Sequence, residues 1–309
     1  MKISKPKFWK TQKNIFSFIL MPISKFLLMY AMLKKKNSVE RNFNIPVICV
    51  GNIYIGGTGK TPLSIEIANQ LNKLKKTAII KKYYKEHKDE HELINAKTNC
   101  LILDANRSLA IEKAKKNGYK IAILDDGFQD HSIKRDLNIL CFNSNQLIGN
   151  GYTFPSGPLR EKLESIKRAD IVIINGRKNK IFEETIINIS RDINIFYSEY
   201  VALNIKQFKN KKICAFAGIG NPENFFKTLS DNNIHLKKTF SFPDHYEFSK
   251  TEIANIINYS KKESLELITT EKDYYRIRNF GFKNIKYLKI DLKILKKEKF
   301  FHQIMSTVQ

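Results

Sequence analysis

The chain beyond residue 41 alternates between short apolar runs and stretches in which apolar positions recur at helical spacing. The apolar runs have the length and composition of buried strands: 46–50, 77–80, 100–104, 121–124, 137–142 and 171–174. Segments such as 63–74 and 108–117 have the spacing of helices and separate several of these runs. Strands that alternate with helices predict a doubly wound parallel sheet, an α/β fold.

The pattern changes near residues 191–204, where an extended stretch indicates a linker. A second series of strand-like and helix-like segments follows: 212–216, 222–229, 251–259, 265–269 and 285–290. We therefore predict a first α/β domain over 42–195. We predict that 196–309 holds the linker and a second, smaller α/β domain.

An apolar run at 15–33 lies between clusters of basic residues in the first 41 positions. As a helix, this run would be about 28 Å long, close to the roughly 30 Å hydrocarbon core of a bilayer. Pro22 and Lys25 disfavour a clean span, because a lysine at the centre of a spanning helix costs about 2.5–3.5 kcal/mol. A cleaved signal peptide is also disfavoured, because no small-residue cleavage site follows. We predict that 1–41 form a basic amphipathic helix segment in the membrane interface; packing on the protein's own body is the alternative.

The net charge narrows the set of expected partners. Lysine and arginine number 54 against 30 aspartates and glutamates, which gives a formal net charge of +24. Such an excess favours anionic partners, unless it reflects only a compositional bias towards lysine. We expect an anionic membrane surface as a partner and no nucleic acid, because no nucleic-acid-binding module is recognisable. The four cysteines form no C-x-x-C pair, so neither a zinc ribbon nor a disulfide framework is indicated.

The glycine-rich segment 51–62 is the strongest local signal. It reads Gly-Asn-Ile-Tyr-Ile-Gly-Gly-Thr-Gly-Lys-Thr-Pro, follows a predicted strand and opens a predicted helix, which is the context of a phosphate loop. In such a loop, backbone N–H groups turn toward phosphate oxygens, the lysine reaches the β- and γ-phosphates, and the threonine hydroxyl ligates Mg²⁺. The first glycine of the strict pattern is replaced by Tyr54. The residues predicted to bind the nucleotide are Gly56, Gly57, Thr58, Gly59, Lys60 and Thr61.

The acidic end of the strand at 121–124 is a second feature of a nucleotide site. A buried strand that leads into Asp125 and Asp126 can hold Mg²⁺ directly or through water. A solvated Asp-Asp-Gly turn is the alternative. These residues and the phosphate loop predict a site for Mg²⁺ and nucleotide, but they do not distinguish a kinase from an ATPase switch. One family of partitioning ATPases has a lysine before the loop glycines, where this chain has Ile55, and this difference counts against that family.

Six segments, in order along the chain, resemble the tetraacyldisaccharide 4'-kinase family of lipid A synthesis. They are 51–62, Asp-Asp-Gly-Phe-Gln at 125–129, Gly-Pro-Leu-Arg-Glu at 157–161, Phe-Ala-Gly-Ile-Gly-Asn-Pro at 216–222, Phe-Pro-Asp-His at 242–245 and Thr-Glu-Lys-Asp at 270–273. Each segment is moderately specific, and their shared order makes coincidence improbable. The N-terminal amphipathic segment fits the same family.

The resemblance implies a kinase with a phosphate-loop domain, a smaller α/β domain and an active site between them. Such a kinase would use ATP and Mg²⁺ to phosphorylate the 4'-hydroxyl of an acylated glucosamine disaccharide 1-phosphate, which gives lipid IVA. It would act at the cytoplasmic face of the bacterial inner membrane as a peripheral or monotopic protein, and no protein partner is expected. A membrane-associated phosphate-loop ATPase that switches a partner, without a lipid substrate, is the alternative.

The resemblance also implies catalytic residues. The family's general base is the aspartate of a Gly-Asp-Glu-Pro segment, which matches Asp89, and its partner is the histidine of Phe-Pro-Asp-His, here His245. Because His245 falls in the second predicted domain, this pairing would need the two domains to close on the substrate. Lys60 and Arg160 complete the catalytic set, and Arg160 is expected to stabilise charge on the transferred phosphoryl group.

The expected metal ligands and substrate contacts lie in the same segments. The metal ligands are Thr61, Asp125, Asp126 and Glu161, and the substrate contacts are Tyr84, Glu90, Arg107 and Gln129. The sequence departs from the family at 81–84, where Lys-Lys-Tyr-Tyr replaces the usual Ser-Arg-Gly-Tyr and only Tyr84 is retained. The segment at 270–273 has no assigned role, and a structural turn is an equally good interpretation.

Overall fold

The computed structural model describes residues 6–84, 87–243 and 246–308, which divide into two compact units. The larger unit comprises 6–83, 100–199 and 292–308, and the smaller unit comprises the described residues of 84–99 and 200–291. This division differs from the sequence-predicted segments, 1–41, 42–195 and 196–309. Residues 6–41 and 196–199 belong to the larger unit. Residues 84–99 belong to the smaller unit rather than to the first domain. Residues 292–308 belong to the larger unit rather than to the second domain.

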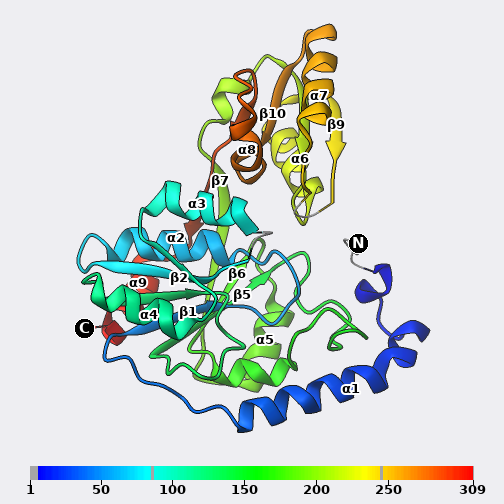
Figure 1. The fold of residues 1–309 in the computed structure, drawn as a ribbon. Helices are drawn as coiled ribbons and strands as arrows, with labels where there is room; N and C mark the ends of the chain where they lie inside the picture. Colours follow the sequence, from blue (N-terminus) through cyan, green and yellow to red (C-terminus); the bar gives the residue numbers. More distant parts are fainter. Residues whose placement is uncertain (1–5, 85–86, 244–245, 309) are drawn as a thin grey trace. The chain divides into compact units, whose positions relative to one another are not determined.

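Largely parallel strands form the sheet of the larger unit (Figure 1). They are β1 (Val47–Gly51), β2 (Thr77–Lys82), β3 (Leu101–Asp104), β4 (Ile121–Asp125), β5 (Leu137–Asn143), β6 (Ile171–Asn175), β7 (Asn194–Ala202) and β12 (Ile290–Ile294). In the described part of the chain these eight strands have the order β12-β7-β6-β5-β1-β4-β2-β3. The order reverses beside β1, which pairs in parallel with β4 on one side and β5 on the other. Open parallel sheets bind their ligands at such reversals.

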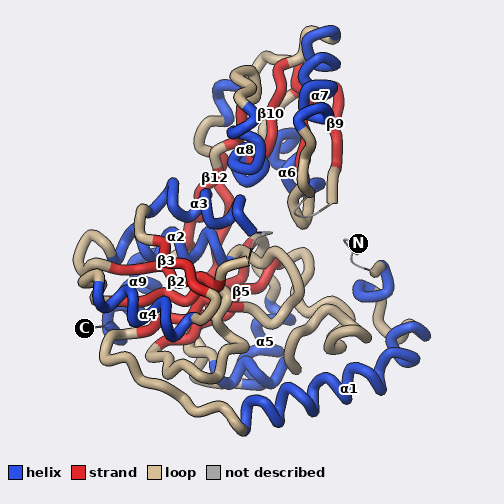
Figure 2. The backbone as a smooth tube through the Cα atoms, viewed as in Figure 1, coloured by secondary structure: helices blue, strands red, loops and turns tan. Residues whose placement is uncertain are grey.

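The central strands of this sheet are buried on both faces. In β1, Val47, Ile48, Cys49 and Val50 have at most 1% of their surface exposed. This burial explains why the strands appear in the sequence as continuous apolar runs rather than as alternating patterns. Helices flank the strands (Figure 2): α2 (Lys60–Leu71), α4 (Arg107–Lys116), α5 (Lys180–Ile189) and α9 (Lys297–Val308). All four cysteines are described, and each is a buried thiol without a disulfide.

The C-terminal helix α9 joins the larger unit through its apolar face. Phe300 and Ile304 are fully buried, and the Phe300 ring meets the Phe196 ring of β7 edge to face, with centroids 5.2 Å apart. The edge strand β12 precedes this helix. The Leu295 N–H donates to the Tyr197 carbonyl, and the Leu203 N–H donates to the Lys289 carbonyl, so β12 runs antiparallel to β7. These contacts explain why the chain's last residues leave the smaller unit.

The smaller unit has a second parallel sheet. Its strands are β8 (Lys212–Ala217), β9 (His235–Ser241), β10 (Glu266–Thr270) and β11 (Lys286–Leu288). Among the described residues these four have the order β11-β10-β8-β9. Ile213, Ala215 and Ala217 pack with α6 (Pro222–Asp231), while Cys214 and Phe216 pack with α7 (Lys250–Lys262). This alternation gives the sheet a core on each face.

Helix α3 (Lys88–Thr98) belongs to the smaller unit because it packs on α8 (Glu271–Ile277). Lys97 pairs with Glu271 at 2.8 Å, and Arg278, just beyond α8, pairs with Glu92 at 3.1 Å. In the chain, α3 lies between β2 and β3 of the other unit. No helix was predicted over these residues from the sequence, and nothing local in the sequence says which sheet such a helix would join.

Helix α1 (Ile15–Lys36) presents apolar side chains to solvent and buries polar ones (Figure 1, dark blue). Its buried residues are Ser17 and Ser24. Ser24 donates to the Thr153 carbonyl at 3.0 Å, and Ser17 accepts a hydrogen bond from the Asn150 amide at 3.0 Å. The helix is long and apolar enough to cross a membrane by length and composition. Eleven of its large apolar side chains are exposed, while its two buried serines and the Phe18 ring contact residues 150–156 of the larger unit, so α1 also packs in part on the protein's own body.

Candidate active site

The segment 51–62 forms a turn between β1 and α2, as a phosphate loop does. Gly56 and Gly59 have φ angles of 117° and 95°, which favour glycine. Gly51 allows a close approach, because a Cβ atom there would lie 2.4 Å from the Cβ of Phe128. The loop therefore depends on glycine for backbone conformation at two positions and for packing at a third.

The buried Asn52 side chain stabilises this loop by hydrogen bonds. This role was not predicted from the sequence. The Asn52 side chain is fully buried, and Nδ2 donates to the Tyr54 carbonyl at 2.7 Å, the Gly56 carbonyl at 3.2 Å and Thr58 Oγ1 at 2.9 Å. Its Oδ1 atom has no hydrogen-bond partner among the described residues. Buried side-chain oxygens are usually hydrogen-bonded, so this oxygen is an exception. The only sequence signal was an asparagine directly after the strand-ending glycine.

The start of α2 meets the acidic end of β4. Thr61 Oγ1 donates to Asp125 Oδ2 at 3.0 Å, and Ser64 Oγ donates to Oδ1 at 3.3 Å. Lys81, at the end of β2, is buried and places its Nζ atom 2.5 Å from Asp125 Oδ2. Lys81 belongs to the segment that departs from the family. The departure therefore brings a cation to the Asp125 carboxylate.

Lys60 lies next to the second carboxylate. Its Nζ atom is 3.8 Å from Asp126 Oδ1. Burial lowers the pKa of Lys60, and Asp126 partly opposes this effect. Burial alone would raise the pKa of Asp126, but Lys60 and Arg160 more than offset it and hold that pKa below its usual range. Asp126 also has a left-handed φ of 64°, an uncommon backbone conformation that concentrates at functional sites.

The segment 157–161 pairs with the phosphate loop and brings in Arg160. The Arg160 N–H donates to the Ile53 carbonyl at 2.7 Å. The Arg160 guanidinium binds both Asp126 oxygens, at 2.8 and 3.2 Å, and Gln129 Oε1 at 3.0 Å. Gln129 in turn donates to the Asn52 carbonyl at 2.9 Å and to Glu161 Oε1 at 3.1 Å. Three motifs that are distant in sequence therefore meet in one hydrogen-bonded network.

Arg107, at the first position of α4, also reaches this network. Its Nη2 atom donates to the Asp126 carbonyl at 2.7 Å, and Nη1 pairs with Asp130 at 3.2 Å. A guanidinium held by a backbone carbonyl and a carboxylate has a fixed orientation. The sequence-predicted Arg107 therefore lies with the phosphate-loop residues in the larger unit.

The residues around Asp125 fit a Mg²⁺ site in part. A threonine hydroxyl beside a carboxylate, at the start of a phosphate-loop helix, offers the oxygen ligands that Mg²⁺ prefers. Asp126 pairs instead with Arg160, and Glu161 pairs with Arg168. Across residues 6–84, 87–243 and 246–308, no group of three or more His, Cys, Asp or Glu side chains is arranged to hold a metal. Of the four predicted ligands, only Thr61 and Asp125 are shown to contact each other in the described part of the chain.

Asp89 lies on α3 in the smaller unit, not in the phosphate-loop domain where the sequence placed it. It is buried, and its carboxylate binds Arg276 at 2.6 and 3.0 Å and Lys272 at 3.4 Å. Glu90 binds Lys272 at 3.0 Å. The Tyr84 ring lies 5.3 Å from that of His87. Asp89 and Glu90 therefore both contact Lys272 of the segment 270–273.

The predicted partner of Asp89, His245, lies outside the described residues. Asp89 belongs to the same unit as Phe242 and Tyr246, which flank that position. The predicted pairing of Asp89 with His245 therefore stays a prediction.

The comparison with known families decides the assignment. A family model described as tetraacyldisaccharide-1-P 4'-kinase matches residues 16–309. This chain belongs to that family. Among its relatives, the tetraacyldisaccharide 4'-kinase of Pelagibacter ubique is 42% identical over 299 residues, which cover 95% of each chain. That of Bartonella quintana is 30% identical over 300 residues, covering 90% of this chain and 86% of the relative.

A solved structure shows the same fold. The crystal structure of LpxK from Aquifex aeolicus in complex with ATP matches with a TM-score of 0.75 and 24% identity, and it covers 96% of this chain and 100% of that one. The predicted tetraacyldisaccharide 4'-kinase family, the predicted α/β fold class and the assignment as a kinase are thus confirmed. The alternative of a switch ATPase gains no support.

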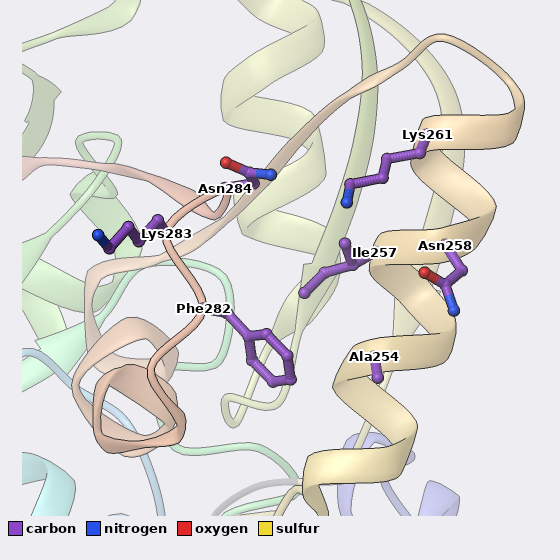
Figure 3. Close-up of a pocket in the computed structure, with 7 residues that line it drawn as sticks. All are labelled: Ala254, Ile257, Asn258, Lys261, Phe282, Lys283 and Asn284. Carbon is purple, nitrogen blue, oxygen red and sulfur yellow. The ribbon is translucent and has the colours of Figure 1, made fainter.

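A pocket of about 160 Å³ lies in the smaller unit of this 4'-kinase family member (Figure 3). It is lined by Ala254, Ile257, Asn258 and Lys261 of α7 and by Phe282, Lys283 and Asn284. Phe282 and Ile257 form its apolar wall. None of the predicted site residues lines it, so the pocket has no part in the assigned chemistry.

Proposed function

We propose that this kinase transfers the γ-phosphoryl group of ATP to the 4'-hydroxyl of a tetraacylated glucosamine disaccharide 1-phosphate. One observation carries the proposal: a phosphate loop, an acidic strand end and the Gly-Pro-Leu-Arg-Glu segment form one network in a chain of the 4'-kinase family. The glycine-rich backbone and Lys60 would bind the phosphates. Arg160 would stabilise charge on the transferred group once the nucleotide competes for its contact with Asp126.

Mg²⁺ is the metal proposed for this site. Thr61 and Asp125 would hold it once it displaces Lys81 from Asp125, and when bound it would neutralise charge on the phosphates. Asp126 and Glu161 are proposed as further ligands, and each would have to exchange an arginine partner for the metal. Gln129, between Arg160 and Glu161, couples these two exchanges through its hydrogen bonds.

Asp89 is the proposed general base. A carboxylate that accepts the proton of the sugar hydroxyl favours its attack on the γ-phosphorus. His245 is proposed as its partner, and Tyr84, Glu90 and Arg107 as substrate contacts. The proposed base belongs to the smaller unit and the phosphate loop to the larger unit.

The proposal is tested by transfer of label from γ-labelled ATP to purified tetraacyldisaccharide 1-phosphate in detergent micelles, with Mg²⁺. We expect labelled lipid in proportion to ADP. ATP hydrolysis that is independent of the lipid, with no labelled lipid, would contradict the proposal and favour an ATPase switch.

The proposed location is the cytoplasmic face of the inner membrane, with α1 lying in the interface. Eleven large apolar side chains of α1 are exposed: Ile15, Phe16, Phe18, Ile19, Ile23, Phe26, Leu27, Met29, Tyr30, Met32 and Leu33. Lys34, Lys35 and Lys36 follow them at the helix end and would contact anionic head groups.

Vesicle sedimentation tests this location. The substitution Phe26→Glu removes an apolar side chain that is 62% exposed, and we expect it to weaken binding to anionic vesicles about tenfold or more, since burying such a side chain contributes about 1.5–3 kcal/mol. The matched control is Leu74→Glu, which alters a 68% exposed leucine outside α1. Equal binding of both variants would place the membrane contact elsewhere.

A further inference from the structure

The segment Thr270–Asp273, to which no role was assigned, lies at the strand-order reversal of the smaller sheet. Strand β8 pairs with β9 on one side and β10 on the other, and the chain passes from β9 over β8 to β10. At the carboxyl ends of β8 and β10 the chain continues into 218–222 and 270–273. Such a reversal is where an open parallel sheet gathers functional side chains. Two of the family segments therefore meet here.

Arg276 joins these two segments to Asp89. Its Nη1 atom donates to the Gly218 carbonyl and to Asp273 Oδ1, each at 2.6 Å. Its Nε and Nη2 atoms donate to Asp89 Oδ2 at 3.0 and 2.6 Å. The guanidinium is planar and rigid, so contacts on one edge fix where the other edge can hold a carboxylate.

Asp273, which orients Arg276, is itself immobilised. Its Oδ2 atom accepts hydrogen bonds from the Gly218 N–H at 2.9 Å and from Thr270 Oγ1 at 2.7 Å. The residue is fully buried, and burial raises its pKa, an effect that Arg276 opposes. A Cβ atom at Gly218 would lie 3.3 Å from the Asp273 carboxylate and 3.1 Å from the Phe248 ring, so a larger residue would press on this support. The chain of contacts thus runs from the backbone of β8 and β10 to the carboxylate of Asp89.

We propose that Arg276 is a positioning residue for Asp89, and that Thr270, Asp273 and Gly218 form the support that orients Arg276. The inference rests on the proposed role of Asp89 as the base. A base must be held within a fraction of an ångström and at a set angle to act on the hydroxyl proton. Lys272 also contacts Asp89, but more distantly and while shared with Glu90, whereas Arg276 makes two hydrogen bonds to one oxygen.

The alternative is that Arg276 only fastens α3 to α8. A purely structural fastening would lower stability or the amount of folded enzyme, without separating kcat from KM. A positioning role lowers kcat in folded enzyme and leaves the KM for ATP unchanged, because the phosphate loop lies in the other unit. These two roles therefore predict different kinetics.

The test measures kcat and the KM for ATP of the full-length enzyme with substitutions at Arg276. We expect Arg276→Gln to lower kcat about 100-fold, the scale of a 1 Å misplacement, with an unchanged KM for ATP. Arg276→Lys should recover at least about tenfold of that loss, because it keeps a donor and the charge. The matched control is Arg278→Gln, which removes the other arginine contact between this region and α3, the pair with Glu92 at 3.1 Å. It should keep kcat within about twofold.

A double variant separates this inference from the proposed base. In the background of Asp89→Asn, adding Arg276→Gln should lower kcat no further, because the two residues act as a unit. The inference is overturned by a wild-type kcat in Arg276→Gln, or by the same fold-loss in both backgrounds. Wild-type kcat in Asp89→Asn alone would instead contradict the assigned base.

Asp273→Asn keeps the test decisive if Arg276→Gln does not fold. This substitution keeps both Asp89 and Arg276 and weakens only the contacts that orient Arg276. We expect an intermediate fall in kcat, about tenfold, with an unchanged KM for ATP. An unchanged kcat in folded Asp273→Asn enzyme would overturn the proposed support.

Discussion

Each unit has a glycine turn and an aspartate at the carboxyl ends of neighbouring parallel strands. In the larger unit they form the phosphate-loop site, and in the smaller unit they support Arg276 and Asp89. In the larger unit a glycine turn follows β1 and Asp125 ends the neighbouring β4; in the smaller unit a glycine turn follows β8 and Asp273 comes shortly after the neighbouring β10. The turns differ in what their backbone does. The Gly218 N–H donates to Asp273 within the protein, whereas Gly56 and Gly59 have the backbone angles of a loop that turns N–H groups toward phosphate.

This difference separates a site that binds a ligand from one that supports a side chain. The phosphate loop has glycine backbone angles that let N–H groups turn toward an anion. In the smaller unit the Gly218 N–H is bonded to Asp273, and Arg276 holds the Asp89 carboxylate on a helix that the chain inserts between β2 and β3. We therefore expect changes in the first site to affect ATP binding and changes in the second to affect the chemical step.

The largest expected effect is that of Lys60→Ala. Loss of the ammonium that we propose binds the phosphates should lower phosphate transfer about 1,000-fold and weaken ATP binding. Lys73→Ala, at an exposed position just beyond the end of the same helix, is the control and should keep wild-type turnover. Transfer rates and ATP affinity would be measured together. Near-normal phosphate transfer by Lys60→Ala would contradict the assignment of 51–62 as the phosphate loop.

The two glycine turns differ in packing, so the same substitution should cost them different amounts of stability. In Gly51→Ala the added Cβ would lie 2.4 Å from another Cβ, while in Gly218→Ala the contacts begin at 3.1 Å. We expect losses of about 3 and about 1 kcal/mol in the free energy of unfolding, respectively. In Gly57→Ala the added Cβ meets nothing within 4 Å, so its loss should stay within about 0.5 kcal/mol. Equal losses at all three positions, by chemical denaturation, would contradict this packing.

A smaller effect concerns His131, beside the phosphate-loop network. Burial and the nearby Arg168 lower the pKa of His131 to about 4 from a usual 6.5. Between these two values the unfolded chain binds more protons than the folded protein, so stability falls as the pH drops from 6.5 toward 4. His131→Gln should reduce the slope of unfolding free energy against pH in this window. An identical slope in wild type and variant would contradict a buried neutral histidine.

Features that depend on consecutive residues could be predicted from the sequence. The phosphate loop, the acidic end of β4 and the parallel sheet follow from glycine spacing, strand-like runs and their order. Contacts of Arg160 and Gln129 with this loop needed the family resemblance as well, because nothing local shows that 157–161 pairs with 53–55.

Features that depend on tertiary partners could not be predicted. The helix α3 was not predicted, and its packing on α8 depends on residues far away in the sequence, so Asp89 was assigned to the other domain. Lys81 reads as a solvated residue of a lysine-rich loop, yet it is buried against Asp125. Arg276 lies three residues after Asp273, outside the recognisable motif, and only the fold brings it to Asp89.

We infer that the two sites have separate roles: the phosphate loop binds ATP, and Asp89 activates the sugar hydroxyl. The most direct measurement compares the equilibrium affinity for ATP and the single-turnover rate of lipid phosphorylation in wild type and Asp89→Asn. We predict an unchanged affinity and a rate about 10²–10⁴-fold lower. An unchanged rate, or a loss of affinity as large as the loss of rate, would contradict the claim.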